Sequence, residues 1–334
     1  MTTPTPDTTP TPGTTSSPGS SPAPGPATDG RRGTAGRVLL AVGLGLGVLV
    51  VAWAALLLVD RAVSSTETTR EDYDASADLG LVADGDVEVR ADDAITGIEV
   101  EVVAHRGLVS PRYGVEQVGD RLVLTHECPS WAWFSWVCSG ELRAVVPTGT
   151  AVDARTSNGD VEASGFDGAE LRSENGDVVA QAIGGDVLAT SSNGDLVLAD
   201  VGGDVEARTS NGDVEASRVE GRVTARSSNG DVAASDVGAG VLARTSNGSV
   251  DVSTVGGEVE AQSSNGRVEV AGAAGDVLAR TSNGSATVVG DGEPVNLVID
   301  TSNGSETIEG PTDPAAQRTV EVRSSNGDVA YLAP

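Results

Sequence analysis

The chain contains no lysine, so all 21 of its basic residues are arginines, and they stand against 49 aspartates and glutamates. The formal net charge is −28. Acids and arginines balance in the first 60 residues, so the whole excess belongs to residues 61–334. A surface of this sign repels the phosphates of nucleic acids and of anionic lipid headgroups. We therefore expect no nucleic-acid partner.

Aromatic residues are also scarce, at 3% of the chain. The only aromatic residues in the segment 151–334 are Phe166 and Tyr331. The core of this part must therefore consist of valine, alanine and leucine, which suit two sheets pressed closely together. The only histidines are His105 and His126, and no long insertion could form a cleft among the repeats. No catalytic constellation is visible, so we expect a non-enzymatic protein that needs no cofactor.

In place of these residues the sequence has a recurring Asn-Gly dipeptide. Its spacing is 17 residues, then 18 six times, then 20 and 23. A fixed period of this length is typical of a repeat architecture. Gly212-Asp213-Val214 is followed nine residues later by Gly221-Arg222-Val223, so each unit holds two short strands and two turns. The repeated asparagines are Asn158, Asn175, Asn193, Asn211, Asn229, Asn247, Asn265, Asn283, Asn303 and Asn326.

Alternation within each strand predicts which side chains face the core. Val205 and Ala207 point one way, whereas Glu206 and Arg208 point the other. A coil of two short strands cannot bury its own apolar face, but parallel stacking of coils closes a thin core and satisfies the backbone. We therefore predict an all-β fold, a parallel β-solenoid with about 18 residues per coil. Its asparagines should form a side-chain amide ladder along a rod of roughly 43 Å.

Two further columns follow when successive units are aligned. One column is apolar and is expected at a buried corner, and the other carries the threonine or serine before each turn. The corner residues are Phe166, Ile183, Val201, Val219, Val237 and Val255. The hydroxyl column is Thr156, Ser173, Ser191, Thr209, Ser227, Thr245, Ser263 and Thr281.

The N-terminal part of the chain differs in composition from the repeats. Residues 1–36 are mostly threonine, proline, serine and glycine, which cannot support a core, and we expect a disordered tail. Residues 37–59 are predicted as a transmembrane helix, because Val38 to Val59 carry no charge and span about 33 Å as a helix. This run is too long, and begins too late, for a cleaved signal peptide.

The distribution of arginine around this apolar run predicts its orientation. Arg31, Arg32 and Arg37 precede the run, whereas only Arg61 adjoins its other end. The positive-inside rule then places the tail in the cytoplasm and the repeats outside. We expect a single-pass protein of the cell membrane whose C-terminal domain is extracytoplasmic.

Between the helix and the repeats we distinguish two segments. Residues 60–75 are polar and acidic and are predicted to be a linker. Residues 76–150 contain short alternating runs such as GIEVEVVA and DRLVLTHE, which predict an N-terminal β region. This region should cap the first coil, because an uncapped solenoid end is an open edge. The repeats are assigned to residues 151–334, with prolines and a longer period marking their far end.

The two cysteines, Cys128 and Cys138, bracket a run of aromatic residues. In an oxidising compartment such a pair predicts a disulfide. His126 precedes Cys128 by two residues, but these three ligands lack the pattern of a zinc site, and no metal is expected. The aromatic residues form either an exposed patch for a membrane or partner, or a plug for the open end of the solenoid, which we favour. They are Trp131, Trp133, Phe134 and Trp136.

One column of arginines does not fit a uniformly acidic rod. Each member precedes the hydroxyl residue of a turn and should project outward. Stacked like charges repel, so they must be neutralised by nearby acids, such as a column of aspartates across the turn, or by an anionic ligand in a groove. The candidate ligand-binding residues are Arg155, Arg172, Arg208, Arg226, Arg244 and Arg280, and the aspartates are Asp160, Asp177, Asp195, Asp213 and Asp231.

The segment from Ala144 to Gly165, AVVPTGTAVDARTSNGDVEASG, and the SNGDV turns after it resemble a known bacterial family. The family is the putative adhesins, β-strand-repeat domains of unknown function. The resemblance extends from about Leu79 to Pro334, and its marks are the strand ending at Val146-Pro147 and the ladder of turns. It implies a membrane-tethered, surface-facing repeat protein and supplies no catalytic residues.

These observations favour a non-enzymatic, membrane-anchored cell-surface scaffold with adhesin-like character. Its expected partner is an anionic polymer of the cell envelope or a surface protein. The alternative is an envelope-stress sensor or regulator that signals across the membrane through the helix and tail. The sequence leaves the choice between them, and the oligomeric state, open.

Overall fold

A computed structural model describes residues 34–131 and 137–334 of the chain. The described residues divide into two units between Ala54 and Ala55, and every described strand belongs to the second. Helix α1 (Thr34–Ala62) includes a stretch, Val42–Ala62, that is long and apolar enough to cross a membrane, with a mean hydropathy of 2.6. The predicted helix at 37–59 therefore extends by three residues at each end. Most of the predicted tail, residues 1–33, lies outside the described part.

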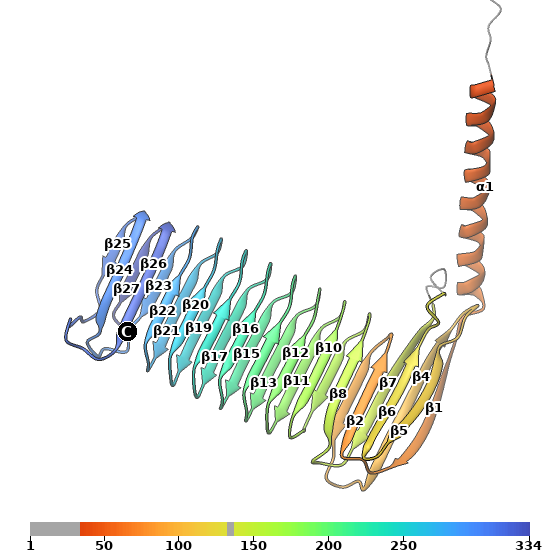
Figure 1. Cartoon of the computed structure of the whole chain (residues 1–334), viewed down its shortest axis with the longest axis horizontal. Helices are drawn as coiled ribbons and strands as arrows, with labels where there is room; N and C mark the ends of the chain where they lie inside the picture. The colour runs from red at the N-terminus through yellow and green to blue at the C-terminus, as the bar shows by residue number, and fades with distance from the viewer. Residues whose placement is uncertain (1–33, 132–136) are drawn as a thin grey trace, which may run out of the picture. The chain divides into compact units, whose positions relative to one another are not determined.

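The strands form two sheets whose members are stacked along one axis (Figure 1). In spatial order, sheet A contains β1 (Ser65–Asp74), β4 (Gly97–Arg106), β7 (Ser139–Val146), β3 (Val87–Ala91), β9 (Val161–Ser164), β11 (Val178–Ile183), β13 (Leu196–Val201), β15 (Val214–Val219), β17 (Val232–Val237), β19 (Val250–Val255), β21 (Val268–Ala273), β23 (Ala286–Val289), β27 (Val329–Leu332) and β25 (Glu306–Ile308). Sheet B, taken in the same direction, contains β5 (Arg112–Val118), β6 (Arg121–Glu127), β2 (Asp78–Ala83), β8 (Ala151–Thr156), β10 (Ala169–Ser173), β12 (Val187–Thr190), β14 (Val205–Arg208), β16 (Val223–Arg226), β18 (Val241–Arg244), β20 (Val259–Gln262), β22 (Val277–Arg280), β26 (Thr319–Asn326) and β24 (Asn296–Asn303).

The repeat coils stack in parallel, as the sequence predicts. Val205 of β14 pairs with Val223 of β16, and Val214 of β15 pairs with Val232 of β17, each one period further along the chain. Valine and alanine from both sheets meet in a continuous core, and Ala207 has no exposed surface. The six predicted corner residues, from Phe166 to Val255, are all buried. The parallel solenoid is therefore confirmed.

The turns are held by three columns of hydrogen bonds that repeat from coil to coil. The buried hydroxyl of Ser227 donates to the Gly212 carbonyl at 2.9 Å and accepts from its own turn at Gly230. The Asn229 amide donates to Asn211 Oδ1 at 2.8 Å, one step of the predicted ladder that runs through all ten asparagines. The buried serines and threonines thus stabilise the turns from inside.

One bend of each coil adopts a left-handed backbone conformation. Ala182, Asp200, Arg218, Asp236 and Thr254 occupy it with φ between 52° and 58°. Glycine occupies the equivalent bend at Gly165 and Gly272. A non-glycine residue is strained in this region by about 1 kcal/mol. The five central coils therefore carry a strain that the coils on either side avoid.

The coil order is exchanged at both ends of the stack. The coil of β2 and β3 lies between the coil of β6 and β7 and the coil of β8 and β9, although it precedes both in sequence. At the other end, β26 and β27 lie between the coil of β22 and β23 and the coil of β24 and β25. We call the end that contains β1, β4 and β5 the helix-linked end, and the end formed by β24 and β25 the free end.

Two predicted segment boundaries are corrected by this topology. Residues 60–75 are not a linker, because α1 continues to Ala62 and β1 pairs antiparallel with β4 over ten residues. Strand β1 was missed because it is polar on both faces and carries no apolar alternation. Residue 151 does not begin the stack either, since β2 pairs in register with β8. The antiparallel β4 and β5 do cap the helix-linked end.

Candidate functional site

The structure brings all six predicted arginines into one column on the outer face of sheet B. Arg208, Arg226 and Arg244 are paired in register on successive strands, which lie about 4.8 Å apart in a sheet. Thr190 and Gln262 interrupt the column, and Arg323 extends it beyond Arg280. Arg323 escaped the sequence reasoning because it stands in the exchanged coil, where the 18-residue period no longer applies.

Most of these arginines are neutralised by acids in the adjacent outward column of the same sheet. The Arg155 guanidinium donates to Asp153 at 2.8 and 2.9 Å, and Arg323 lies 2.9 Å from Glu321. The remaining pairs in the column are Arg172 with Glu170, Arg208 with Glu206, and Arg244 with Glu260 of the next coil. All are partly exposed, so each contributes about 1 kcal/mol or less to stability.

The predicted aspartate column has a different role from the one expected of it. Asp195 Oδ1 accepts the backbone amide of Asp213 at 2.8 Å, and Asp213 Oδ1 accepts that of Asp231 at 2.7 Å. These carboxylates therefore bind the backbone of the following coil. The expectation that they neutralise the arginines is wrong, because the adjacent Glu and Asp side chains lie closer on the same flat face.

The arginine column has a section with little acid beside it. Thr224 stands next to Arg226, and Leu278 stands next to Arg280. Among the described residues, neither of these two arginines has an ion pair within 4 Å. From β16 to β22 the outward side chains of sheet B include three arginines, Arg226, Arg244 and Arg280, against the single acid Glu260. We call this section the arginine face.

The outer face of sheet A has the opposite character. Its outward positions in β15, β19 and β21 carry Glu215, Asp251 and Glu269. The neighbouring outward column is small, with Ser217, Ser235 and Ser253 in register. From β9 to β23 no strand of sheet A presents an arginine outward except Arg218 at the bend, which pairs with Asp200 at 2.6 Å. Positive charge on the regular coils is therefore concentrated on sheet B.

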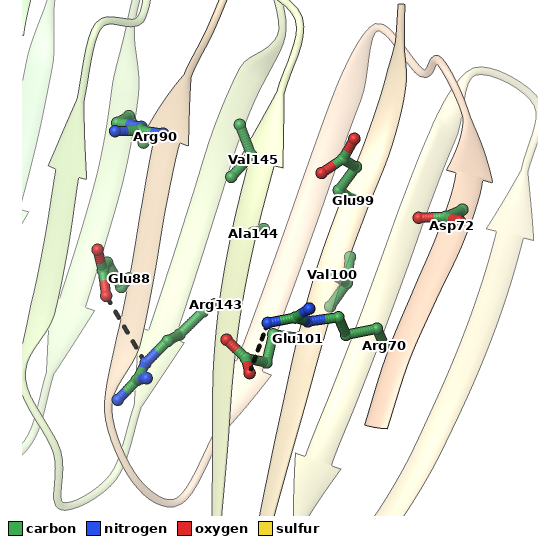
Figure 2. A pocket seen from close by; sticks show the side chains of 10 residues that line it. All are labelled: Arg70, Asp72, Glu88, Arg90, Glu99, Val100, Glu101, Arg143, Ala144 and Val145. Carbon is green, nitrogen blue, oxygen red and sulfur yellow. Dashed lines mark ion pairs between the residues drawn. The ribbon is translucent and has the colours of Figure 1, made fainter. Parts of the chain in front are cut away.

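A hollow of about 460 Å³ lies on the outer face of sheet A at the helix-linked end (Figure 2). Side chains of β1, β4, β7 and β3 line it, and Arg143 lies 3.7 Å from Glu88 while Arg70 lies 3.7 Å from Glu101. The sequence did not indicate this hollow, because its strands adjoin in an order that differs from the chain. Its charged residues, Arg70, Asp72, Glu88, Arg90, Glu99, Glu101 and Arg143, largely offset one another.

Polar side chains also cluster where β1, β4, β5 and β6 line a second hollow of about 350 Å³. His126 is almost fully buried there, and burial lowers its pKa below the usual range. Its ring packs edge-on against Tyr113, whose hydroxyl lies 2.6 Å from that of Tyr73. Burial and this hydrogen bond raise the Tyr113 pKa. Among the described residues no group of three or more His, Cys, Asp or Glu is placed to hold a metal ion.

The cysteine-bracketed loop connects β6 to β7. Cys128 and Cys138 form a disulfide with their Cα atoms 6.1 Å apart. Trp131 is 57% exposed, so it does not plug the end of the core, which β4 and β5 cover instead. The other predicted aromatic residues, Trp133, Phe134 and Trp136, lie outside the described residues.

Comparison with known proteins gives structural likeness without a family assignment. No family model matches the chain, and no curated protein matches it. Among solved structures, a putative cell adhesion protein from Clostridium sporogenes is 10% identical, with a TM-score of 0.23 over 80% of this chain and 100% of its own. A putative adhesin from Bacteroides fragilis is 11% identical, with a TM-score of 0.32 over 81% of this chain and 97% of its own. A putative adhesin from Parabacteroides distasonis is 14% identical, with a TM-score of 0.33 over 80% of this chain and 97% of its own. These scores are too low to carry an argument about function, which must come from the chain itself.

Proposed function

We propose that the protein is a non-enzymatic, membrane-anchored surface scaffold that binds an anionic polymer of the cell envelope. The observation that carries this proposal is the arginine face, the section of sheet B where Arg226, Arg244 and Arg280 meet only one acid. A net positive strip on a chain of charge −28 is a feature that solubility alone does not require.

The geometry of the arginine face suits a long ligand with repeated negative groups. Each guanidinium is planar and can donate two parallel hydrogen bonds to one carboxylate or phosphate. Parallel pairing sets these donors in a straight row, with Arg226 and Arg244 about 4.8 Å apart and Arg280 about two strand spacings beyond Arg244, because Gln262 lies between them. Several weak contacts along one chain reinforce one another, because each binding event raises the local concentration of the next group. The acids elsewhere would exclude the same ligand from the rest of the surface.

Anchoring is supported by the apolar stretch Val42–Ala62. Only Val63 and Ser64 separate helix α1 from strand β1, so the solenoid would be held close to the membrane that the helix crosses. The proposed orientation, with the tail inside and the solenoid outside, rests on the arginines before the helix.

The test compares two triple substitutions that change the charge equally. In the first, Arg226, Arg244 and Arg280 become glutamine. In the second, the acid-paired Arg155, Arg172 and Arg208 become glutamine. The full chain in neutral lipid nanodiscs is titrated with poly(glycerol phosphate), polygalacturonate and uncharged dextran. We expect the first variant to bind both anionic polymers at least about tenfold more weakly, the second to bind nearly as the unaltered protein does, and dextran to bind to neither.

Thermal unfolding of the same variants separates binding from folding. If both variants lose affinity equally, or if affinity follows the folded fraction, the arginine column is structural and the proposal fails. If the unaltered protein binds neither anionic polymer, the proposal also fails.

A signalling role remains the second candidate because of one contact at the end of α1. Asp60 is buried, and its Oδ1 accepts the backbone amide of Leu108 at 2.7 Å. The last turn of the helix is therefore fixed to the segment between β4 and β5. A nitroxide on Leu58→Cys would report movement there when polymer is added. A sensor predicts a spectral change that Asp60→Ala abolishes, whereas a passive anchor predicts no change.

A further inference from the structure

The two edges at the free end of the stack are strands β24 and β25, and each is paired on one side only among the described residues (Figure 1). Strand β25 is three residues long. Strand β24 is eight residues long and pairs with β26 from Asn296 to Asn303. A long strand with one unpaired edge is a template for the addition of another strand.

The regular coils show which backbone groups of β24 are left without partners. In each coil the first inward residue of sheet B donates its amide to the following coil, as Val205 does to Arg222 O at 2.8 Å and Val223 does to Gly240 O at 2.9 Å. Val320 of β26 pairs with Val277 of β22 on one side and with Leu297 of β24 on the other. Leu297 is therefore the first inward residue of sheet B in the last coil. No described coil follows it, and the open edge begins at Leu297 because Val295, just before β24, is already bridged to Thr312. By the same alternation, the amides and carbonyls of Leu297, Ile299 and Thr301 face outward along the stack axis.

The sequence of β24 does not protect this edge in the usual ways. Natural edge strands are blunted by charges, prolines or bulges. Strand β1 at the helix-linked end follows this rule with five charged residues in ten. Strand β24 has one charged residue, Asp300, and no proline. Core side chains are also less covered here, since Leu297 and Ile299 are only partly buried and Ile308 is 51% exposed.

The charge around the free end favours a basic partner. Residues 290–317 contain six acids and no arginine. Arg318, which follows this segment, is engaged by Asp291 at 2.6 Å. The column that carries arginine on the preceding strands ends in Asp300, which pairs in register with Arg323. The acids are Asp291, Glu293, Asp300, Glu306, Glu309 and Asp313.

A second copy of the chain is a poor occupant for two reasons. The same six acids would face one another across a two-fold contact. The asparagine ladder also has a direction: Asn303 donates to Asn326 Oδ1 at 3.0 Å, and no described residue donates to the Asn303 Oδ1. Two free ends brought together would oppose acceptor to acceptor, whereas a foreign strand with amide or basic side chains would supply the missing donor.

We propose that the outer edge of β24 is a docking site for an extended, lysine- or arginine-rich segment of another protein, which adds to sheet B as one more strand. Backbone hydrogen bonds to Leu297, Ile299 and Thr301 provide the affinity, and the surrounding acids select the basic partner. This site is separate from the arginine face and does not depend on the polymer-binding proposal.

The probe is a capped nine-residue peptide that alternates lysine with valine and threonine, carries a fluorophore and binds to the full chain in neutral nanodiscs. Two control peptides replace each lysine by glutamate, or three alternate residues by proline. We expect micromolar binding of the basic peptide and at least about tenfold weaker binding of both controls. Hydrogen exchange should slow at the amides of Leu297, Ile299 and Thr301, with no change on β14 or β16.

Charge variants of the protein complete the test. Asp300→Asn with Glu306→Gln and Glu309→Gln should weaken binding of the basic peptide. The matched control neutralises three acids on sheet A, Glu215→Gln, Asp251→Asn and Glu269→Gln, and should leave binding unchanged. Equal weakening by both triples, equal binding of the proline peptide, or absence of protection on β24 would overturn the proposal. Sedimentation as a dimer that protects β24 without peptide would overturn it in favour of a second copy.

Discussion

The middle of the solenoid and its two ends use the same kind of coil but connect it differently. From β10 to β21 every strand pairs with the strand one 18-residue period further on. At the ends the partners are distant in sequence, as in the bond from Asn326 to Asn283 across 43 residues or from Asp160 to Asp86 across 74. Contacts between close residues form quickly, whereas long loops must close before distant contacts stabilise anything. The middle can therefore assemble coil by coil, and the ends close it afterwards.

The largest expected effect comes from removing the exchanged coil at the free end, residues 319–334. Because β26 and β27 lie inside the stack, their loss also separates β24 and β25 from β22 and β23. Two coils should be lost for the deletion of one, at a cost of several kcal/mol in interface free energy. Limited proteolysis with mass spectrometry should trim this variant to about residue 290. Protection of residues 296–308 would show that the last coil can dock directly on β22 and β23.

A smaller effect is expected from crowding a turn in the middle. An added Cβ at Gly212 would lie 2.0 Å from the Gly194 carbonyl oxygen of the preceding coil. Gly212→Ala should therefore lower the free energy of unfolding by about 3 kcal/mol, measured by thermal and urea unfolding. The matched change at the helix-linked end, Gly119→Ala, meets nothing within 4 Å and has only its φ of 63° against it. Gly119→Ala should lower the free energy of unfolding by about 1 kcal/mol. Equal costs would mean that coil spacing relaxes around the new methyl group.

Acidification should distinguish the ends from the middle. Burial lowers the pKa of His126, so the folded state favours neutral imidazole and binds fewer protons than the unfolded state below about pH 6.5. The contribution of neutral His126 to the free energy of unfolding is fully present above that pH. It decreases as the pH falls toward the pKa of the folded state. Hydrogen exchange corrected for intrinsic rates should show β6 opening more at pH 5.5 than at pH 7.5, with β16 unchanged. His126→Gln should remove the difference, and persistence of the difference would assign it to other groups.

The smallest effect is a gain in stability at one strained bend of the middle. Ala182 has φ of 54°, where glycine is favoured. Ala182→Gly should raise the free energy of unfolding by about 1 kcal/mol. Ala180→Gly, two residues earlier at a fully buried position, should lower it, because it removes a packed methyl group and adds backbone freedom. Chemical unfolding of the pair measures both signs. Destabilisation by Ala182→Gly would show that packing at the bend outweighs its strain.

The contrast between middle and ends also explains how much the sequence could predict. Asn-Gly spacing and alternation identify the coil, its inward residues and the arginine column, because these depend on local periodicity. The exchanged order of the last two coils leaves no such signal, because the sequence of each coil would fit next to β22 and β23. The position of Arg323 beside Arg280 was therefore missed. Strand β1 was missed because antiparallel pairing with β4 requires backbone groups only. Which arginines find an acid also depends on the next coil, as with Arg244 and Glu260, whose adjacency only the observed register shows.

The asparagine ladder has a consequence for the chemical lifetime of the protein. Asn-Gly is the dipeptide most prone to deamidation, which begins when the glycine nitrogen attacks the asparagine side-chain carbonyl. Here the Gly230 amide is held by the Ser227 hydroxyl at 2.9 Å, and the Asn229 side chain is fixed at both ends by its neighbours in the ladder. Neither partner can turn toward the other while the coils stay stacked. Ageing should therefore begin at the two ends of the ladder, Asn158 and Asn303, which each have a ladder neighbour on one side only, and proceed inward from there.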